Sequence, residues 1–274
     1  MLSSADSSRI YRHAYLPEHL PVYVESISGA RPHLHRNYLC FTRKTHLIFI
    51  GYPLSGSSDD APRAYASACE RFDPQTVALI ASDIWLPPAT VEKQPPDSYY
   101  RLNLPLKTMN SKTANMVRRA GRELTVRHGK FMRAHKKLVK AFLKDHRLTA
   151  EQISVYNRIG KYLARSSTAH LIEAIKRDVL VAFTVVDTGS ADNAFYLFNF
   201  RSKKEYIPGA SDLLFKAMVD LAQSEGKKAI NLGLGIHAGI RRFKEKWGGK
   251  PFLSYITDIK NIRPLDFNDL SKKL

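Results

Sequence analysis

The spacing of apolar residues in the first third of the chain predicts strands and one helix. Residues 19–26 (HLPVYVES) form an apolar run typical of a strand, and residues 37–53 (NYLCFTRKTHLIFIGYP) predict a hairpin that turns near 43–45. A helix is expected over 62–72 and a strand over 76–86. Residues 87–98 contain four prolines, which can neither extend a helix nor donate within a sheet. We interpret this segment as a linker that separates two domains, 1–98 and 99–274.

The second part predicts a longer alternation of elements. We expect strands at 99–106 and 125–131, and helices at 110–124, 132–147 and 149–165. Thr149 and Gln152 have the spacing of a capping box at the start of the last of these helices. Three antiparallel strands follow, with turns at 176–178 and 189–193, and then helix 211–225, strand 227–234, helix 237–247 and strand 248–260. The fold class is therefore mixed α/β, with mostly antiparallel sheets flanked by helices.

Composition narrows the class of protein. The chain has 274 residues, 44% of them hydrophobic, and contains no apolar run of about 18 residues that would span a membrane. The first residues are Ser-rich and lack the pattern of a signal peptide, so we expect a cytoplasmic protein. Cys40 and Cys69 are expected to be small core residues. His33, His35, Asp59 and Asp60 lack the spacing of a metal site, and we predict no metal.

The net charge of +18 is concentrated in one segment. Residues 101–147 contain 14 Lys or Arg and 2 Asp or Glu, a net charge of +12. Such a block favours a polyanionic donor or acceptor, and it would also suit peripheral contact with RNA or with the anionic inner face of a membrane. A solvated basic surface without a specific partner is the simpler interpretation, and the sequence leaves both open.

Residues 231–249 (NLGLGIHAGIRRFKEKWGG) suggest at first a dinucleotide-binding loop, because a strand precedes the glycines and a helix follows them. The spacing is GxGxxxG, however, and the fingerprint requires GxGxxG. Only 16 residues follow Asp258, which is too few for the further strands of such a domain. We therefore reject a dinucleotide-binding fold.

The segment before helix 211–225 suggests an anion site. Backbone amides of Gly209, Ala210 and Ser211 would point from the first turn, where the helix dipole favours negative charge. Lys203 and Lys204 lie just upstream. A glycine-capped helix with exposed lysines would have the same sequence, so this signal is weak alone.

Taken together, the segments GASDLLFKAMVDLAQSEGKKAINLG and NLGLGIHAGIRRFKEKWGGKP resemble the FemAB-like branch of the GNAT superfamily, which includes the aminoacyltransferases of peptidoglycan interpeptide bridges. The resemblance extends over about residues 99–259 and includes NMVRRAGREL. It implies tandem GNAT-like domains, of which 1–98 is a diverged first copy. It also implies an acyltransferase whose donor is acyl-CoA or aminoacyl-tRNA and whose acceptor is an amine that attacks the donor directly.

The resemblance also implies roles for single residues. In many GNAT acetyltransferases a tyrosine on the last short helix is the general acid, and Lys244 occupies that position here. A motif lysine of the FemAB-like branch is implicated in holding the donor or the oxyanion, so we assign Lys244 to the oxyanion. We expect Ile240, Phe243 and Trp247 to form the buried stripe of this helix, with Lys244 beside it and able to extend outward.

The remaining candidates follow from chemistry and position. His237 could serve as a general base and Tyr206 as an acid. Asn199 is assigned to the substrate and Arg201 to the donor, because both end the strand that enters the donor loop. Arg118, Arg119 and Arg122 could bind phosphate. The alternative to an enzyme is a non-catalytic GNAT-like module that binds RNA or a membrane surface through 101–147.

Overall fold

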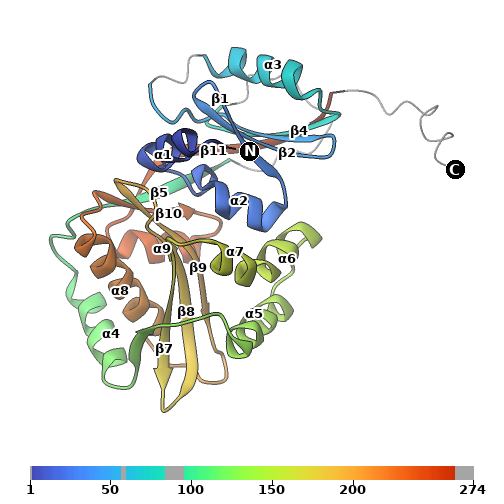
Figure 1. Cartoon of the computed structure of the whole chain (residues 1–274). Helices are drawn as coiled ribbons and strands as arrows, with labels where there is room; N and C mark the ends of the chain where they lie inside the picture. Colours follow the sequence, from blue (N-terminus) through green and yellow to red (C-terminus); the bar gives the residue numbers. More distant parts are fainter. Residues whose placement is uncertain (1, 57–59, 84–95, 263–274) are drawn as a thin grey trace, which may run out of the picture.

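Eleven strands form one continuous mixed sheet in the computed structural model, which describes residues 2–56, 60–83 and 96–262. The strand order is β1-β2-β3-β4-β11-β5-β10-β9-β8-β7-β6. Neighbouring strands are antiparallel except for the pairs β3–β4 and β10–β9. The predicted mixed α/β class with mostly antiparallel sheets and flanking helices is confirmed (Figure 1).

Residues 4–81, called the first half below, form the upper lobe in Figure 1, and the residues from 97 onward are called the second half. The elements of the first half are α1 (Ser4–His13), a 3-10 turn (Pro17–His19), α2 (Pro21–Ser28), β1 (Arg31–His35), β2 (Tyr38–Arg43), β3 (His46–Ile50), α3 (Ala61–Phe72) and β4 (Thr76–Ala81). Helix α3 covers one face of these strands with a core that includes buried Cys40, while Cys69 is half-buried beside it. The expected hairpin and helix of this half are confirmed, and the strand expected over 76–86 is confirmed for residues 76–81; residues 84–86 lie outside the described residues.

Helix α2 replaces the strand that was predicted at 19–26, so that prediction is wrong. Pro21 fits the first turn, where no N–H partner is needed. Gly29 ends the helix with φ +75°, and its N–H donates to the carbonyl oxygen of Glu25. These terminal signals outweigh the strand preference of the valines and the tyrosine between them. Helix α1 and strand β1 were not predicted.

The second half contains the larger lobe. Its elements are β5 (Asp97–Asn103), α4 (Ser111–Gly121), β6 (Thr125–His128), α5 (Arg133–Asp145), α6 (Ala150–Asn157), α7 (Ile159–Arg165), β7 (Ala169–Lys176), β8 (Val179–Asp187), β9 (Asn193–Arg201), α8 (Ala210–Ser224), β10 (Ala229–Leu234), α9 (Ala238–Lys246) and β11 (Lys250–Asn261). Helices α4 and α8 cover one face of this sheet, and α5, α6 and α7 cover the other (Figure 1).

Most elements of this half were predicted within a few residues. The predicted helix 149–165 is instead two helices, α6 and α7, which are separated at Arg158. The Arg158 guanidinium donates to the carbonyl oxygen of Ile27 at 2.7 Å, so this break connects the helix pair to α2. The capping box of Thr149 and Gln152 is present as predicted.

Strand β11 joins the two halves. Its residues 250–255 pair with β5, and its residues 256–261 pair with β4 of the first half. Helix α2 also packs against α7, where Tyr23 and Tyr162 meet edge to face. The predicted division at residues 98 and 99 therefore falls within a shared sheet and stays a prediction. Of the linker predicted at 87–98, residues 87–95 lie outside the described residues.

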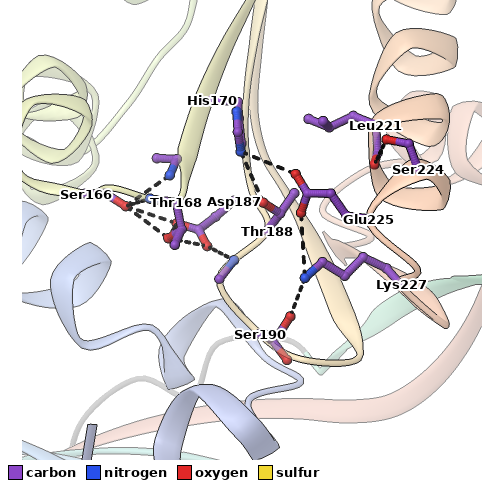
Figure 2. A network of polar contacts seen from close by, with 12 residues as sticks. Ser166, Thr168, His170, Asp187, Thr188, Ser190, Leu221, Ser224, Glu225 and Lys227 are labelled. Atoms are coloured by element: carbon purple, nitrogen blue, oxygen red, sulfur yellow. Dashed lines mark hydrogen bonds and ion pairs between the residues drawn. The ribbon is translucent and has the colours of Figure 1, made fainter. Parts of the chain in front are cut away.

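A buried carboxylate fixes the turn between β8 and β9. Asp187 is 2% exposed and accepts from the hydroxyls of Tyr162, Ser166 and Thr168 and from the N–H of Gly189. Figure 2 shows Ser166 and Thr168 converging on it. Because several neutral donors surround the carboxylate, its burial needs no cation. The network connects the turn before β9 to α7 and to the segment before β7, and β9 forms one wall of the site described below.

Candidate active site

Strands β9 and β10 separate after a short parallel contact. They pair only at Ala229–Asn193, Ile230–Ala194 and Asn231–Phe195. Beyond these pairs, β9 remains paired with β8 only, and β10 remains paired with β5 only. Residues 196–201 of β9 and 232–234 of β10 thus form the two sides of a wedge, and a cavity of about 500 Å³ lies between them.

Helices close this cavity on its other sides. Phe142 of α5 and Tyr156 of α6 contribute aromatic walls. Helix α9 contributes Ile240, Phe243 and Lys244. The volume is within the usual range of about 300–1,000 Å³ for small-molecule sites, and the few polar groups among apolar walls are typical of such sites.

Lys244 extends into the protein, not outward as expected. Its side chain is 3% exposed, although Ile240 and Phe243 on the same helix are only half-buried. Its Nζ donates to the carbonyl oxygen of Leu234 at 2.6 Å and lies 5.5 Å from the ring centre of Tyr100. The expectation that Lys244 extends outward beside the buried stripe is wrong; Trp247, at the end of the stripe, is buried as expected.

Burial lowers the pKa of Lys244 from 10.5 to about 7, and the nearby carboxylate of Asp97 opposes part of that decrease. Removal from water destabilises the ammonium, and no carboxylate contacts Nζ among the interactions of the described residues. The charge of Lys244 can therefore change near neutral pH, whereas an exposed lysine remains protonated there.

Helix α9 is held in place by contacts just after Lys244 in the chain. The buried carboxylate of Asp212, in the first turn of α8, accepts from Trp247 Nε1 at 2.9 Å and from Lys246 Nζ at 2.6 Å. Asn110, the residue that caps α4, donates to the carbonyl oxygen of Lys246 at 2.9 Å. These bonds fix the helix that carries Lys244 against the sheet.

The turn from β10 to α9 contains a residue in an unusual conformation. Ile236 has φ +48°, in the left-handed region that a β-branched residue rarely adopts. The Asp97 carboxylate accepts from the N–H groups of Ser98, Gly235 and Ile236 at 2.7, 3.1 and 2.6 Å. This carboxylate compensates for the strain. The Ile236 side chain lines the cavity and is 67% exposed, so it lies at the entrance.

His237 lines the cavity and caps α9. Its Nδ1 accepts from the N–H groups of Gly239 and Ile240 at 3.1 and 3.4 Å. In the neutral ring the proton must then be on Nε2, which makes that nitrogen a donor. This geometry favours hydrogen-bond donation by His237 and disfavours the predicted general-base role.

A second cavity of about 490 Å³ adjoins the first near the start of α8. The two cavities share Phe142, Asn199, Phe200, Arg201 and Ser211, so they lie side by side with a common wall. Lys203 and Lys204 line the second cavity, where Lys203 forms an ion pair with Asp145 at 3.0 Å. Ser211 donates to Asn199 Oδ1 at 3.3 Å, at the boundary between the two.

The start of α8 requires glycine. Gly209 precedes the helix with φ +85° and no side-chain cap. A Cβ at this position would lie 2.5 Å from the carbonyl oxygen of Met116, so α4 packs directly on it. This close packing sets the position of the first turn of α8, where Ala210 is buried and Ser211 faces both cavities.

The structure brings together only some of the predicted residues. Asn199, Arg201, Ser211, His237 and Lys244 line the first cavity, and Arg201, Lys203 and Lys204 line the second. Tyr206 is 53% exposed and lines neither; its ring lies under the Arg201 guanidinium. Arg118, Arg119 and Arg122 are exposed at the end of α4, and they too line neither cavity.

Within the described ranges, no three His, Cys, Asp or Glu side chains come together as ligands for a metal ion. No helix among the described residues has both the length and the apolar character needed to cross a bilayer.

Sequence reasoning missed Asp97, Ile236 and the aromatic walls. Asp97 is separated from Ile236 by 139 residues, and nothing in its local sequence indicates the contact. The helix predicted at 132–147 carries Phe142, but the place of this ring at a cavity depends on the separation of β9 from β10.

Comparison with known proteins supports the fold. No protein-family model matches the chain, and no curated protein matches it in sequence. Among solved structures, one similar chain is the C-terminal domain of a protein described as a lysylphosphatidylglycerol synthetase from Agrobacterium fabrum: identity 15%, TM-score 0.61, covering 92% of this chain and 90% of that one. FemX matches with identity 10% and TM-score 0.58, covering 93% and 96%.

A third similar structure is a tandem GNAT protein from the clavulanic acid biosynthesis pathway, with identity 12% and TM-score 0.50, covering 84% of this chain and 79% of that one. The fold is GNAT-like. FemAB-like proteins are among its structural relatives, as the sequence resemblance implied. At these identities the likeness establishes the GNAT-like fold alone, and chemistry has to be argued from the site.

Proposed function

We propose that this GNAT-like protein is an acyltransferase that moves an acyl or aminoacyl group from acyl-CoA, or from aminoacyl-tRNA, to an amine. The observation that carries the proposal is Lys244, a buried lysine that lines a cavity between two separating strands. The adjoining cationic cavity supplies Arg201, Lys203 and Lys204 for the anionic part of the donor. FemX and the tandem GNAT protein share the fold, which agrees with a transferase.

The reaction would proceed by direct attack. The lone pair of the acceptor amine forms a bond to the donor carbonyl carbon, and the carbonyl oxygen becomes an oxyanion. The amine nitrogen loses a proton, and the intermediate collapses as the bond to sulfur or to the ribose oxygen breaks. The leaving thiolate or alkoxide then takes up a proton. No covalent enzyme intermediate is required.

Lys244 would act in its protonated form on the oxyanion. One proton is already donated to the Leu234 carbonyl oxygen, which leaves two N–H bonds for the donor. A positioned donor of this kind contributes roughly 3 kcal/mol when water is excluded. As pH rises past the pKa of Lys244, the charge is lost and this contribution disappears.

Titration calorimetry with coenzyme A and acetyl-CoA at two salt concentrations tests the donor, followed by mass spectrometry of a mixture with candidate amines. We expect saturable binding and a mass gain on one amine, with turnover reduced about 100-fold or more in Lys244→Ala. Lys228→Ala, in which an exposed lysine is changed, is the matched control. Equal turnover in Lys244→Ala and the wild-type protein would contradict the proposal.

A second candidate function rests on the outer face of α5. Arg133, Lys136, Lys137, Lys140 and Lys144 are exposed, and no ion pair holds any of them within the described part of the chain. Such a face suits a polyanion in a protein without catalysis. Binding that weakens steeply with salt and is unchanged in Lys244→Ala would support this alternative.

A further inference from the structure

The walls of the first cavity are mostly hydrocarbon. They include the rings of Phe142, Tyr156, Tyr196 and Phe243, and the side chains of Leu197, Leu232 and Ile240. The space of about 500 Å³ has to hold the acyl group and the adjoining thioester arm of the donor, and a longer acyl chain would displace more water from these walls.

The ionisable groups in the walls include two bases, Arg201 and Lys244. No Asp or Glu belongs to the part of the wall that the described residues form. Asp97, whose charge acts on Lys244, already accepts from three backbone amides. An aminoacyl group carries an ammonium, which would enter this cavity without a counter-charge and beside other cations.

The aromatic walls do not form a free cage for such a cation. One face of Phe142 is stacked on His146 with ring centres 4.1 Å apart, and Phe200 is stacked on Phe183 at 4.9 Å. Lys246 Nζ already lies 4.8 Å from the ring centre of Phe243. Recognition of an ammonium by rings requires open faces turned toward it, and each of these contacts already occupies one ring face.

We infer that the transferred group is an uncharged apolar acyl chain of medium length, which lies between β9 and β10 with its carbonyl carbon near Lys244. This inference rests on the proposed function and names the class of donor within it. Ile236 at the entrance and Ile240 on α9 would contact the chain, because both line the cavity and neither is fully buried.

The test compares donors that differ only in the acyl group. Titration calorimetry would use acetyl-, butyryl-, hexanoyl- and octanoyl-CoA, and β-alanyl-CoA as the ammonium-bearing counterpart of butyryl-CoA. We expect affinity to rise up to about fourfold per methylene, as burial of hydrocarbon predicts. β-Alanyl-CoA should bind at least tenfold more weakly than butyryl-CoA.

A matched pair of variants tests whether the acyl chain lies in the first cavity. Ile240→Trp narrows the cavity and should abolish the gain from hexanoyl to octanoyl, while Ile259→Trp changes an exposed residue of β11 and should preserve it. Equal affinity across the four chains, or tighter binding of β-alanyl-CoA, would overturn the inference and leave the acyltransferase proposal standing.

A second arm separates the two proposals. Octanoate and 8-aminooctanoate would be titrated without coenzyme A. If no coenzyme A ester binds but octanoate binds and 8-aminooctanoate does not, the acyl-CoA donor is wrong and the apolar preference of the cavity is supported. If neither octanoate nor any acyl-CoA binds the folded protein, the inference is overturned.

Discussion

Lys244 donates a hydrogen bond from Nζ to the carbonyl oxygen of Leu234, 2.6 Å away, across the turn that connects β10 to α9. The bond joins a helix residue to the last residue of a central strand. It also holds the ammonium inside the sheet layer, where burial lowers the pKa of Lys244 to about 7. The contact therefore positions the side chain, while its burial makes the charge state sensitive to pH near neutrality.

Replacement of Lys244 by methionine should stabilise the fold. Because the pKa of Lys244 is about 7 in the folded protein and 10.5 in a free lysine, the unfolded chain binds more protons between these pH values. Wild-type stability should thus rise with pH across this window, by at most about 1.4 kcal/mol per pH unit. Lys244→Met lacks this dependence and should gain about 1 to 4 kcal/mol at pH 7.

Urea unfolding of Lys244→Met at a series of pH values measures the change in slope. The control is Lys228→Met, because the Lys228 side chain is 75% exposed. Identical slopes in the two variants would show that the buried ammonium has no effect on stability.

Asp97→Asn should loosen the turn at Ile236. The amide nitrogen of asparagine cannot accept from a backbone N–H, so one of the three N–H groups loses its partner. We expect a loss of about 1 to 3 kcal/mol in the free energy of unfolding. Hydrogen exchange at the amides of Gly235 and Ile236 should rise in parallel.

Asp220→Asn, which changes an exposed ion pair on α8, is the matched control for this substitution. If exchange at Gly235 and Ile236 stays at the wild-type rate in Asp97→Asn, the carboxylate does not hold the strained conformation.

Gly209→Ala should destabilise more than Gly226→Ala. Both glycines have positive φ, +85° and +70°, so the strain of an alanine there is similar at roughly 1–2 kcal/mol. Only at Gly209 would the new Cβ meet a backbone atom, the carbonyl oxygen of Met116 at 2.5 Å, while Gly226 has open space. The difference between the two variants in thermal unfolding measures the packing of α4 on α8. Equal losses of stability in the two variants would mean that α4 can shift away from α8 at no measurable cost.

Asp187→Ala should reduce the free energy of unfolding by about 3 kcal/mol, because the buried hydroxyl of Tyr162 and its neighbours lose their acceptor. Asp192→Ala removes a half-exposed ion pair near the same turn and should change stability by less than about 0.5 kcal/mol. Chemical denaturation of both variants gives the comparison. A loss in Asp187→Ala no larger than in Asp192→Ala would contradict the structural role of the network.

The sequence predicted the helices and strands of the second half well, because periodicity and terminal residues agree there. Thr149 and Gln152 cap α6 as their spacing indicates. The strand prediction for 19–26 failed because the residues between Pro21 and Gly29 favour a strand, whereas Pro21 and Gly29 themselves favour the two ends of a helix. Local preference and terminal signals conflicted, and the packing of α2 on α7 supports the helix.

The candidate site was predictable only in part. Asn199, Arg201, Ser211, His237 and Lys244 could be named, since they flank segments with a recognisable pattern. The inward orientation of Lys244 could not be predicted, because helical spacing places it beside the apolar stripe and gives no information about the space under the helix. Asp97 could not be linked to Ile236 either, since that contact depends on the pairing of β5 with β10.

Strand β11 has a consequence for synthesis on the ribosome. It lies between β4 and β5 in the sheet, yet it follows every other strand in the chain. Until residues 250–261 leave the exit tunnel, one edge of β4 and one edge of β5 have no partner, and such edges readily pair with other chains. The nascent protein should therefore depend on chaperones until translation passes this strand, and ribosome pausing shortly before it should increase aggregation.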